Sequence, residues 1–206
     1  MANSSLRLHL TNARSGASYR LSAARPVENN PIPQSVNFAD RSDVDRMAPG
    51  GIFCKNLDSN NGLVFLSDPL PTTTEISGLF SGQFEFITNK KDFDFNVALY
   101  ELTPSGEYFQ LAPFWARASY VGDMSRRRLL TPGKGQRLDF CSTRLMSHQL
   151  HAGSRIVLVL SIIKEPGRQL NYGTGKGVSD ETLQDAKLPL EIEWSSASYI
   201  ELPVAK

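Results

Sequence analysis

Apolar and polar residues alternate with period two along much of this chain, and this pattern constrains the fold more than any other feature. The clearest example is the segment 92–99, Asp-Phe-Asp-Phe-Asn-Val-Ala-Leu, in which the large apolar residues share one parity. Successive side chains of a strand point to opposite faces, so this segment predicts an antiparallel strand with one face in the core and one in water. Shorter alternating segments lie at residues 6–10, 76–86, 137–140 and 190–194.

Two further features lead to the prediction of an all-β fold. Residues 156–160 are uniformly apolar, as in a strand buried on both faces, and the Thr-Pro-Ser-Gly sequence at 103–106 is typical of a type I turn. Helix signals are scarce, and the best lies at 179–186, where Ser179 or Asp180 would cap one short helix. About ten short strands with polar turns and long crossovers predict a jelly-roll β-sandwich with at most one or two short helices.

The length of 206 residues predicts one domain over residues 1–206. Within it, residues 22–62 are rich in Pro, Asn, Ser, Asp and Gly and contain few alternating stretches. They predict a long irregular arm, followed by the main sandwich at 63–206. Because an unstructured loop of that length is unusual inside a compact domain, we expect the arm to pack on another surface.

Charge and hydropathy exclude several classes of partner. The formal net charge is +1, from 22 Lys and Arg against 21 Asp and Glu, which predicts no nucleic-acid partner. The longest nearly unbroken apolar run, 156–163, is too short to span a bilayer, so no membrane partner is predicted. No signal peptide is visible at the N-terminus, which leaves the compartment open between cytoplasm and periplasm. Self-association into a homo-oligomer also stays open.

Residues that could carry chemistry are few. The chain has no Gly-x-Ser-x-Gly nucleophile elbow, and its two cysteines, Cys54 and Cys141, lie in apolar contexts that predict buried thiols, with a single bridge between them left open. His9 falls on the polar face of a strand and is expected in solvent. His148 and His151 have no acidic or Cys partner at a metal-site spacing, so no metal and no cofactor are predicted.

Two loops invite a binding interpretation that their spacing does not support. The basic run at 125–128 stands alone and predicts a solvated loop. The glycine-rich segment 173–179 fails the phosphate-loop spacing and predicts a mobile or tightly turned loop. Composition and spacing therefore predict a β-sandwich without catalytic machinery of its own.

A series of short motifs, each weak alone, gives a stronger indication through its order. The motifs lie at residues 66–70, 74–78, 92–95, 98–106, 117–119, 130–133, 152–156, 171–175 and 200–204. In this order the chain resembles, over nearly its whole length, the C-terminal jelly-roll domain of the Xaa-Pro dipeptidyl-peptidase, cocaine esterase and α-amino-acid ester hydrolase superfamily. That resemblance implies a galactose-binding-like sandwich. The chain has Gly-Ser-Arg at 153–155 where the family often has Gly-His-Arg, and its Asn-Tyr-Gly loop favours an acylase-like or acyl-esterase-like branch.

The resemblance implies a function for the domain. Full-length members are serine hydrolases whose catalytic residues all lie in an upstream α/β-hydrolase domain, so this chain alone is expected to be inactive. It would pack on that domain and help wall the active-site cleft for an acyl ester or amide substrate. Candidate cleft-lining residues are Gly50, Gly51, Ile52 and Phe53, and the candidate interdomain-facing loop is Asn171, Tyr172 and Gly173. For Phe53 the alternative is that it plugs the edge of its own sandwich.

A second interpretation is a free-standing carbohydrate-binding or adhesive β-sandwich. A sugar platform needs two or three exposed aromatic side chains on one sheet face. Trp115 and Trp194 fall on inward parities, which argues against this alternative. A hydrolase domain encoded directly upstream would decide for the accessory domain, whereas a self-contained gene would favour the free-standing module.

Overall fold

The computed structural model describes residues 4–40, 52–57, 59, 62–164 and 168–205. Its secondary structure is almost entirely β, with one helical turn, α1 (Leu183–Ala186), and two 3₁₀ turns at Ala118–Tyr120 and Val178–Asp180. The strands are β1 (Ser4–Ser15), β2 (Ser18–Ser22), β3 (Ile32–Val36), β4 (Phe53–Cys54), β5 (Leu63–Leu66), β6 (Thr74–Gly78), β7 (Ser81–Thr88), β8 (Asp94–Leu102), β9 (Tyr108–Arg117), β10 (Gly135–Cys141), β11 (Met146–Leu150), β12 (Arg155–Ile162), β13 (Leu190–Trp194) and β14 (Tyr199–Val204). No helix among these residues is long and apolar enough to cross a membrane.

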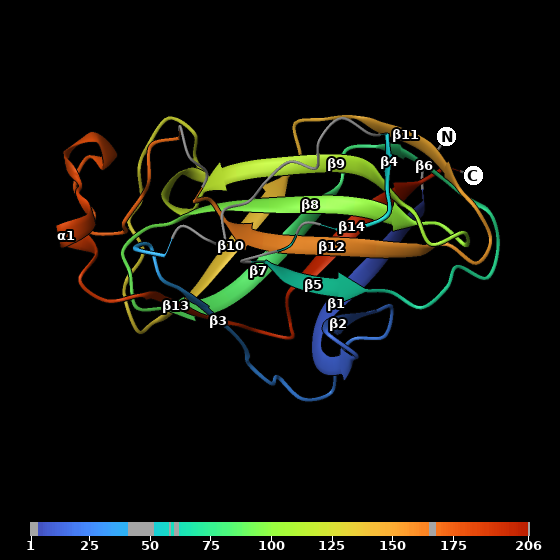
Figure 1. The fold of residues 1–206 in the computed structure, drawn as a ribbon, viewed down its shortest axis with the longest axis horizontal. Coiled ribbons are helices and arrows are strands. Elements are labelled where there is room, and N and C mark those ends of the chain that lie inside the picture. The colour runs from blue at the N-terminus through green and yellow to red at the C-terminus, as the bar shows by residue number, and fades with distance from the viewer. Residues whose placement is uncertain (1–3, 41–51, 58, 60–61, 165–167, 206) are drawn as a thin grey trace.

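The strands form two layers, which confirms the predicted sandwich (Figure 1). One layer runs β5-β12-β8-β9 with β4 at its edge, and the other contains β3, β13, β7, β14 and β1, with β10 beside β7. Strand β2 joins the layers, because it pairs antiparallel with β1 and parallel with β5. Strands β6 and β11 pair with one another, and β6 also contacts β14.

Strand β8 lies at the centre of its layer, between β12 and β9. Phe95, Val97 and Leu99 are fully buried on the inner face, as predicted. The prediction that the other face lies in water is wrong, because Asn96 and Ala98 are buried as well. Residues 156–160 are buried on both faces, as predicted.

The core between the layers is aromatic. Trp194 is fully buried and makes edge or tilted contacts with Phe84, Phe86 and Phe93, at centroid distances of 5.4, 5.1 and 6.1 Å. Its indole N–H donates to the Gln34 side chain at 2.9 Å, which satisfies the one polar atom of this ring.

Gln34 belongs to β3, so residues 22–62 are not irregular throughout. Ile32, Gln34 and Val36 alternate inward, and β3 pairs with β13 along its full length. The alternation at 32–36 is short, and the proline at 33 hides it, because proline is a poor strand former. Proline is tolerated here because β3 is an edge strand.

His9 also differs from expectation, since its residue is only 7% exposed. Strand β1 lies between β14 and β2, and the His9 ring packs against Tyr199 at 5.7 Å. Burial, with the charges of Arg7 and Arg25, lowers the pKa of His9, so the ring is neutral at neutral pH.

The predicted turn and helix are present with one change of detail. Gly106 N–H donates to the Thr103 carbonyl at 2.9 Å in the turn that joins β8 to β9, and Gly106 has φ of +85°. The helical turn begins later than predicted: Thr182, not Ser179 or Asp180, is the N-cap, in a capping box with Asp185.

Phe95→Ala and Leu99→Ala should each destabilise the domain, because both side chains are fully buried at the centre of β8. The cavities should cost about 3–5 kcal/mol for Phe95→Ala and about 2–5 kcal/mol for Leu99→Ala. Urea denaturation measures the free energy of unfolding, with Ile87→Ala as the control because Ile87 is 42% exposed. Losses under about 1 kcal/mol for both core variants would contradict the assignment of their face.

Candidate functional site

The two groups of predicted site residues lie at opposite ends of β8 (Figure 1). Asn171 contacts Asp94 at the start of the strand, whereas Phe53 pairs with Phe109, which lies opposite Glu101 near its end. Glu101 lies seven residues after Asp94 in this strand, a distance of about 23 Å. The structure therefore does not bring the two groups together.

The arm residues form the first group. Gly50 and Gly51 lie outside the described residues, and Ile52 and Phe53 are 74% and 51% exposed. Phe53 and Cys54 form β4, which pairs with the edge of β9, and the Phe53 ring tilts against Phe109 at 5.3 Å. Phe53 thus lies at the edge of the sandwich with about half of its surface in solvent, and its role as a cleft-lining residue stays a prediction.

A buried carboxylate supports this aromatic edge from behind. The Phe109 ring stacks on His148 at 4.4 Å with an interplanar angle of 13°, and His148 Nε2 lies 2.7 Å from Glu101 Oε2. Glu101 is 1% exposed and also accepts hydrogen bonds from the Ser154 hydroxyl at 2.6 Å and the His151 backbone N–H at 3.3 Å. Burial alone would raise the pKa of Glu101, but these hydrogen bonds hold that pKa below its usual value.

Sequence reasoning missed this arrangement because the acidic partner of the two histidines is distant in the chain. Glu101 comes from β8, 47 residues before His148. Among the described residues, no group of three or more His, Cys, Asp or Glu side chains is placed to hold a metal ion.

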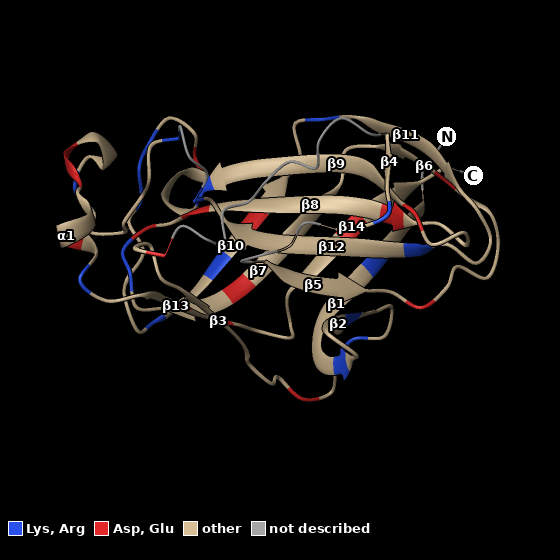
Figure 2. Ribbon diagram, in the orientation of Figure 1, with Lys and Arg blue, Asp and Glu red and all other residues tan. Residues whose placement is uncertain are grey.

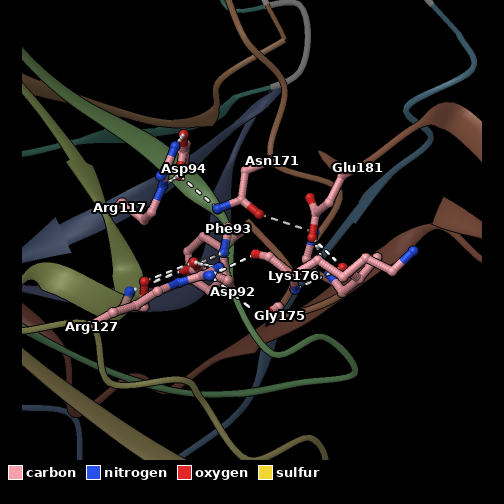
Figure 3. A network of polar contacts seen from close by, with 12 residues as sticks. Asp92, Phe93, Asp94, Arg117, Arg127, Asn171, Gly175, Lys176 and Glu181 are labelled. Atoms are coloured by element: carbon pink, nitrogen blue, oxygen red, sulfur yellow. Dashed lines mark hydrogen bonds and ion pairs between the residues drawn. The ribbon is translucent and has the colours of Figure 1, made fainter. Parts of the chain in front are cut away.

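The second group belongs to a polar network at the start of β8 (Figure 3). Asp92 is fully buried and accepts hydrogen bonds from the Ser119 N–H and hydroxyl at 3.0 and 2.7 Å. Arg127 donates to Asp92 at 3.0 Å and to the carbonyls of Gly175 and Lys176 at 3.3 and 2.6 Å. The expectation that the basic run is solvated is therefore wrong for Arg127, which ties two loops to one carboxylate.

Asn171 and Gly173 are buried in this network. Asn171 donates to Asp94 at 2.8 Å and accepts from the Gly173 N–H at 3.0 Å, and Asp94 also takes a bidentate pair from Arg117 at 2.7 and 2.9 Å. Gly173 has φ of +77°, and a Cβ there would come within 2.5 Å of the Asp92 carbonyl, so only glycine fits. The loop is tightly turned, one of the two expected outcomes.

The ring of Tyr172 packs edge-on against Phe38 at 5.4 Å. The Glu181 carboxylate accepts the backbone N–H groups of Tyr172 and Thr174 at 2.7 and 2.9 Å. These contacts all lie within the domain, so the role of Asn171, Tyr172 and Gly173 at a domain interface stays a prediction.

An apolar groove of about 730 Å³ between β9 and β10 was not predicted. Trp115 lines it and is 40% exposed, so its predicted inward orientation is wrong, and this argument against a carbohydrate-binding module does not hold. Phe114 and Trp115 are adjacent aromatic residues of one strand, so only one of them faces the core, and it is Phe114.

The two cysteines also differ from expectation. Cys141 lines the groove and is exposed, and Cys54 is partly exposed. Neither forms a disulfide, and the prediction of buried thiols is wrong.

Comparison with known families decides the affiliation of this sandwich. The family described as the X-Pro dipeptidyl-peptidase C-terminal non-catalytic domain matches residues 3–183. The chain belongs to this family. A comparison with curated proteins finds no match.

Solved structures contain the same fold as this X-Pro dipeptidyl-peptidase C-terminal domain. An aminopeptidase from the marine sediment archaeon Thaumarchaeota archaeon superposes with a TM-score of 0.79 at 15% identity, over 99% of this chain and 37% of that protein. An α-amino acid ester hydrolase gives 0.74 at 19% identity, over 98% and 36%. A CocE/NonD family hydrolase from Staphylococcus aureus gives 0.66 at 12% identity, over 98% and 37%. The chain thus spans just over a third of the length of these proteins.

One motif that carries the family resemblance has a structural role in this X-Pro dipeptidyl-peptidase C-terminal domain. Within the 66–70 motif, the Ser67 hydroxyl accepts the Ile156 N–H at 2.9 Å, and the Ser67 carbonyl accepts from Arg155 at 2.8 Å. These bonds extend the pairing of β5 with β12 beyond the end of β5. This motif therefore marks the fold, not a binding site.

Asp92→Asn should destabilise the domain by about 3 kcal/mol, because it leaves Arg127 without the charge that compensates it in a largely buried position. The control is Asp68→Asn, whose partner Arg20 is exposed, with an expected loss of about 0–1 kcal/mol. Denaturation at neutral pH compares the two variants. Equal losses would show that the charge of Asp92 does not anchor the loops.

The stabilising effect of the Glu101 carboxylate should disappear in acid. A carboxyl whose pKa is lowered by folding stabilises fully above its unfolded pKa, about 4.3, and this effect is lost as the pH falls through the folded pKa. Glu101→Gln should therefore be less stable than the native domain at neutral pH, with a gap in unfolding free energy that narrows as the pH falls below the unfolded pKa. Urea curves at several pH values measure the gap, with Glu75→Gln, at an exposed position, as the control. A gap of constant size down to the lowest pH would contradict the assignment.

Proposed function

We propose that this chain is the accessory domain of a serine α/β-hydrolase that acts on acyl esters or amides. It packs on the catalytic domain of that enzyme and forms part of the wall of the active-site cleft. The observation that carries the proposal is the match to a non-catalytic domain family, in a chain that corresponds to about a third of each of three solved hydrolases and peptidases.

The place of Ser4 in the sheet supports contact between an upstream domain and the arm. Ser4 pairs with Val204, Val204 with Ile76, and Ile76 with His148, whose ring stacks on Phe109. A catalytic domain joined ahead of Ser4 would thus emerge at the end of the sandwich where β4 lies.

Ile52 and Phe53 would supply the wall itself. Both are apolar and exposed; Phe53 lies on β4, which pairs with β9 and is supported by the Phe109–His148 stack, and Ile52 directly precedes β4. An apolar wall of this kind holds an acyl or aromatic group and excludes water from the reaction. Because the wall contributes no catalytic group, its effect would be on substrate preference.

A free-standing carbohydrate-binding module is less well supported. Such a site needs polar groups near an exposed aromatic ring to bind sugar hydroxyls. The charged residues that line the groove with Trp115 are Arg117 and Asp139, and both are already paired, with Asp94 and with Arg137; the guanidinium of Arg168 lies over the Trp115 ring. The other polar groups in the lining are the hydroxyls of Tyr120 and Thr143, and the remaining lining residues are apolar or cysteine.

The proposal is tested in the polypeptide that joins this domain to its hydrolase domain. Phe53→Ala should shift the preference among ester substrates of different acyl length, measured as ratios of kcat/KM, while unfolding free energy changes by less than about 1 kcal/mol because Phe53 is half exposed. Ile87→Ala, at a partly exposed position on the other layer, should leave the ratios unchanged. A loss of several kcal/mol in stability with unchanged ratios would place Phe53 in the core and overturn the proposed wall.

A further inference from the structure

The groove between β9 and β10 lies where both layers of the sandwich have an open edge. Among the described strands, β10 pairs only with β7, and β9 beyond its two-residue contact with β4 pairs only with β8. The groove is lined chiefly by Phe114, Trp115, Tyr120, Val121, Met124 and Cys141. Met124 is 85% exposed and lies next to the exposed Trp115 in this groove, so the two form part of one apolar surface and are not isolated exposed residues.

The composition of the groove is that of an interface core. Aromatic residues, Met and Arg are enriched at the centres of protein interfaces, and Trp and Tyr account for much of their binding energy. In this groove Trp115 and Tyr120 lie with Met124, and Arg168 stacks over the Trp115 ring at 5.1 Å.

The two charged residues that line this groove already have partners within the domain. Its two charged lining residues are Arg117, held by Asp94 at 2.7 Å, and Asp139, which accepts from Gln83 at 2.8 Å and pairs with Arg137 at 3.0 Å. Removing water from an unpaired charge is costly, whereas each of these two charges would remain paired within the domain after a partner covers the groove. Figure 2 shows the ribbon of β9 largely free of charged residues until its end at Arg117.

The loop that carries Met124 is held in place before any partner binds. Ser119 is fixed by Asp92, the Arg128 N–H donates to the Ser119 carbonyl at 2.7 Å, and Asp123 accepts the Ser125 N–H and hydroxyl at 3.0 and 2.6 Å. A preordered loop loses little conformational entropy on association, so exposed apolar groups on it bind more strongly than on a flexible loop.

We propose that this groove is a docking surface for the catalytic hydrolase domain, continuous with the contact made by the arm. The inference rests on the proposed function and extends it. Phe53 contacts one end of β9 and Trp115 lies at the other, six residues from Phe109, or about 20 Å along one edge strand. A partner of domain size spans that distance, and the solved relatives contain nearly two thirds of their length outside the part that matches this chain.

The two cysteines allow a direct test, because each reports on one part of the surface. Cys141 lines the groove, and Cys54 lies in β4 beside Phe53. The labelling rate of each thiol with N-ethylmaleimide is measured by peptide mass spectrometry, in this chain alone and in the polypeptide that includes the hydrolase domain. We expect Cys141 to react at least about tenfold more slowly in the longer polypeptide, since labelling then requires the interface to open.

Which of the two thiols is protected from labelling distinguishes docking at the groove from the accessory-domain function itself. Slow labelling of Cys141 supports docking at the groove. Protection of Cys54 alone would overturn the proposal that the groove is a docking surface, while leaving the proposed accessory-domain function intact. Unchanged rates at both thiols would overturn both.

Matched substitutions give a second readout. Met124→Glu should restore the labelling rate of Cys141 in the longer polypeptide, because it places a charge in the apolar interface, and it should not affect folding at a position that is 85% exposed. Val27→Glu introduces the same charge at a fully exposed position between β2 and β3, away from the groove, and should leave Cys141 protected. Equal labelling of Cys141 in the two variants would overturn the groove as the docking surface.

Discussion

Strand β8 is buried on both of its faces, and this constraint determines how the two ends of the sandwich are built. A charged group beside such a strand cannot reach water, so it needs a partner within the domain. Asp92, just before the strand, takes Arg127 and Ser119, and Glu101, near its end, takes Ser154 and His148. These partners come from distant parts of the chain. The two carboxylates therefore fix the loops at both ends as well as satisfying their own charges.

Much of the fold could be predicted from the sequence, because a period-two pattern is local. Leu190, Ile192 and Trp194 are all buried, as their alternation indicates, and the turn at 103–106 forms where its Pro and Gly place it. Two of the failures have one cause, which is that the pattern does not reveal what lies against the face of a strand. Asn96 and His9 lie on faces that look polar in sequence, yet both are buried.

The candidate site could be predicted only in part, for a related reason. Resemblance to the family points to Phe53, but nothing local in the sequence indicates that Phe109 and His148 would support its ring. The same holds for Arg127, which looks like part of a solvated basic run until Asp92 is placed beside it. Pairing across 35 residues, as between these two, depends on topology, and topology is not encoded in any single window of sequence.

The open edge of β9 also indicates how a partner would bind there. An exposed strand edge invites pairing with another strand, and proteins commonly block such edges with proline or charge. The open half of β9 contains Pro113, which pairs with Ala98 of β8 and whose missing N–H must face away from that neighbour. A strand added at this edge would therefore find no N–H donor at Pro113, in the middle of the pairing. The surface beside it is built from side chains, Trp115 and Met124 among them, so association there would proceed by apolar packing against a folded domain and not by extension of the sheet.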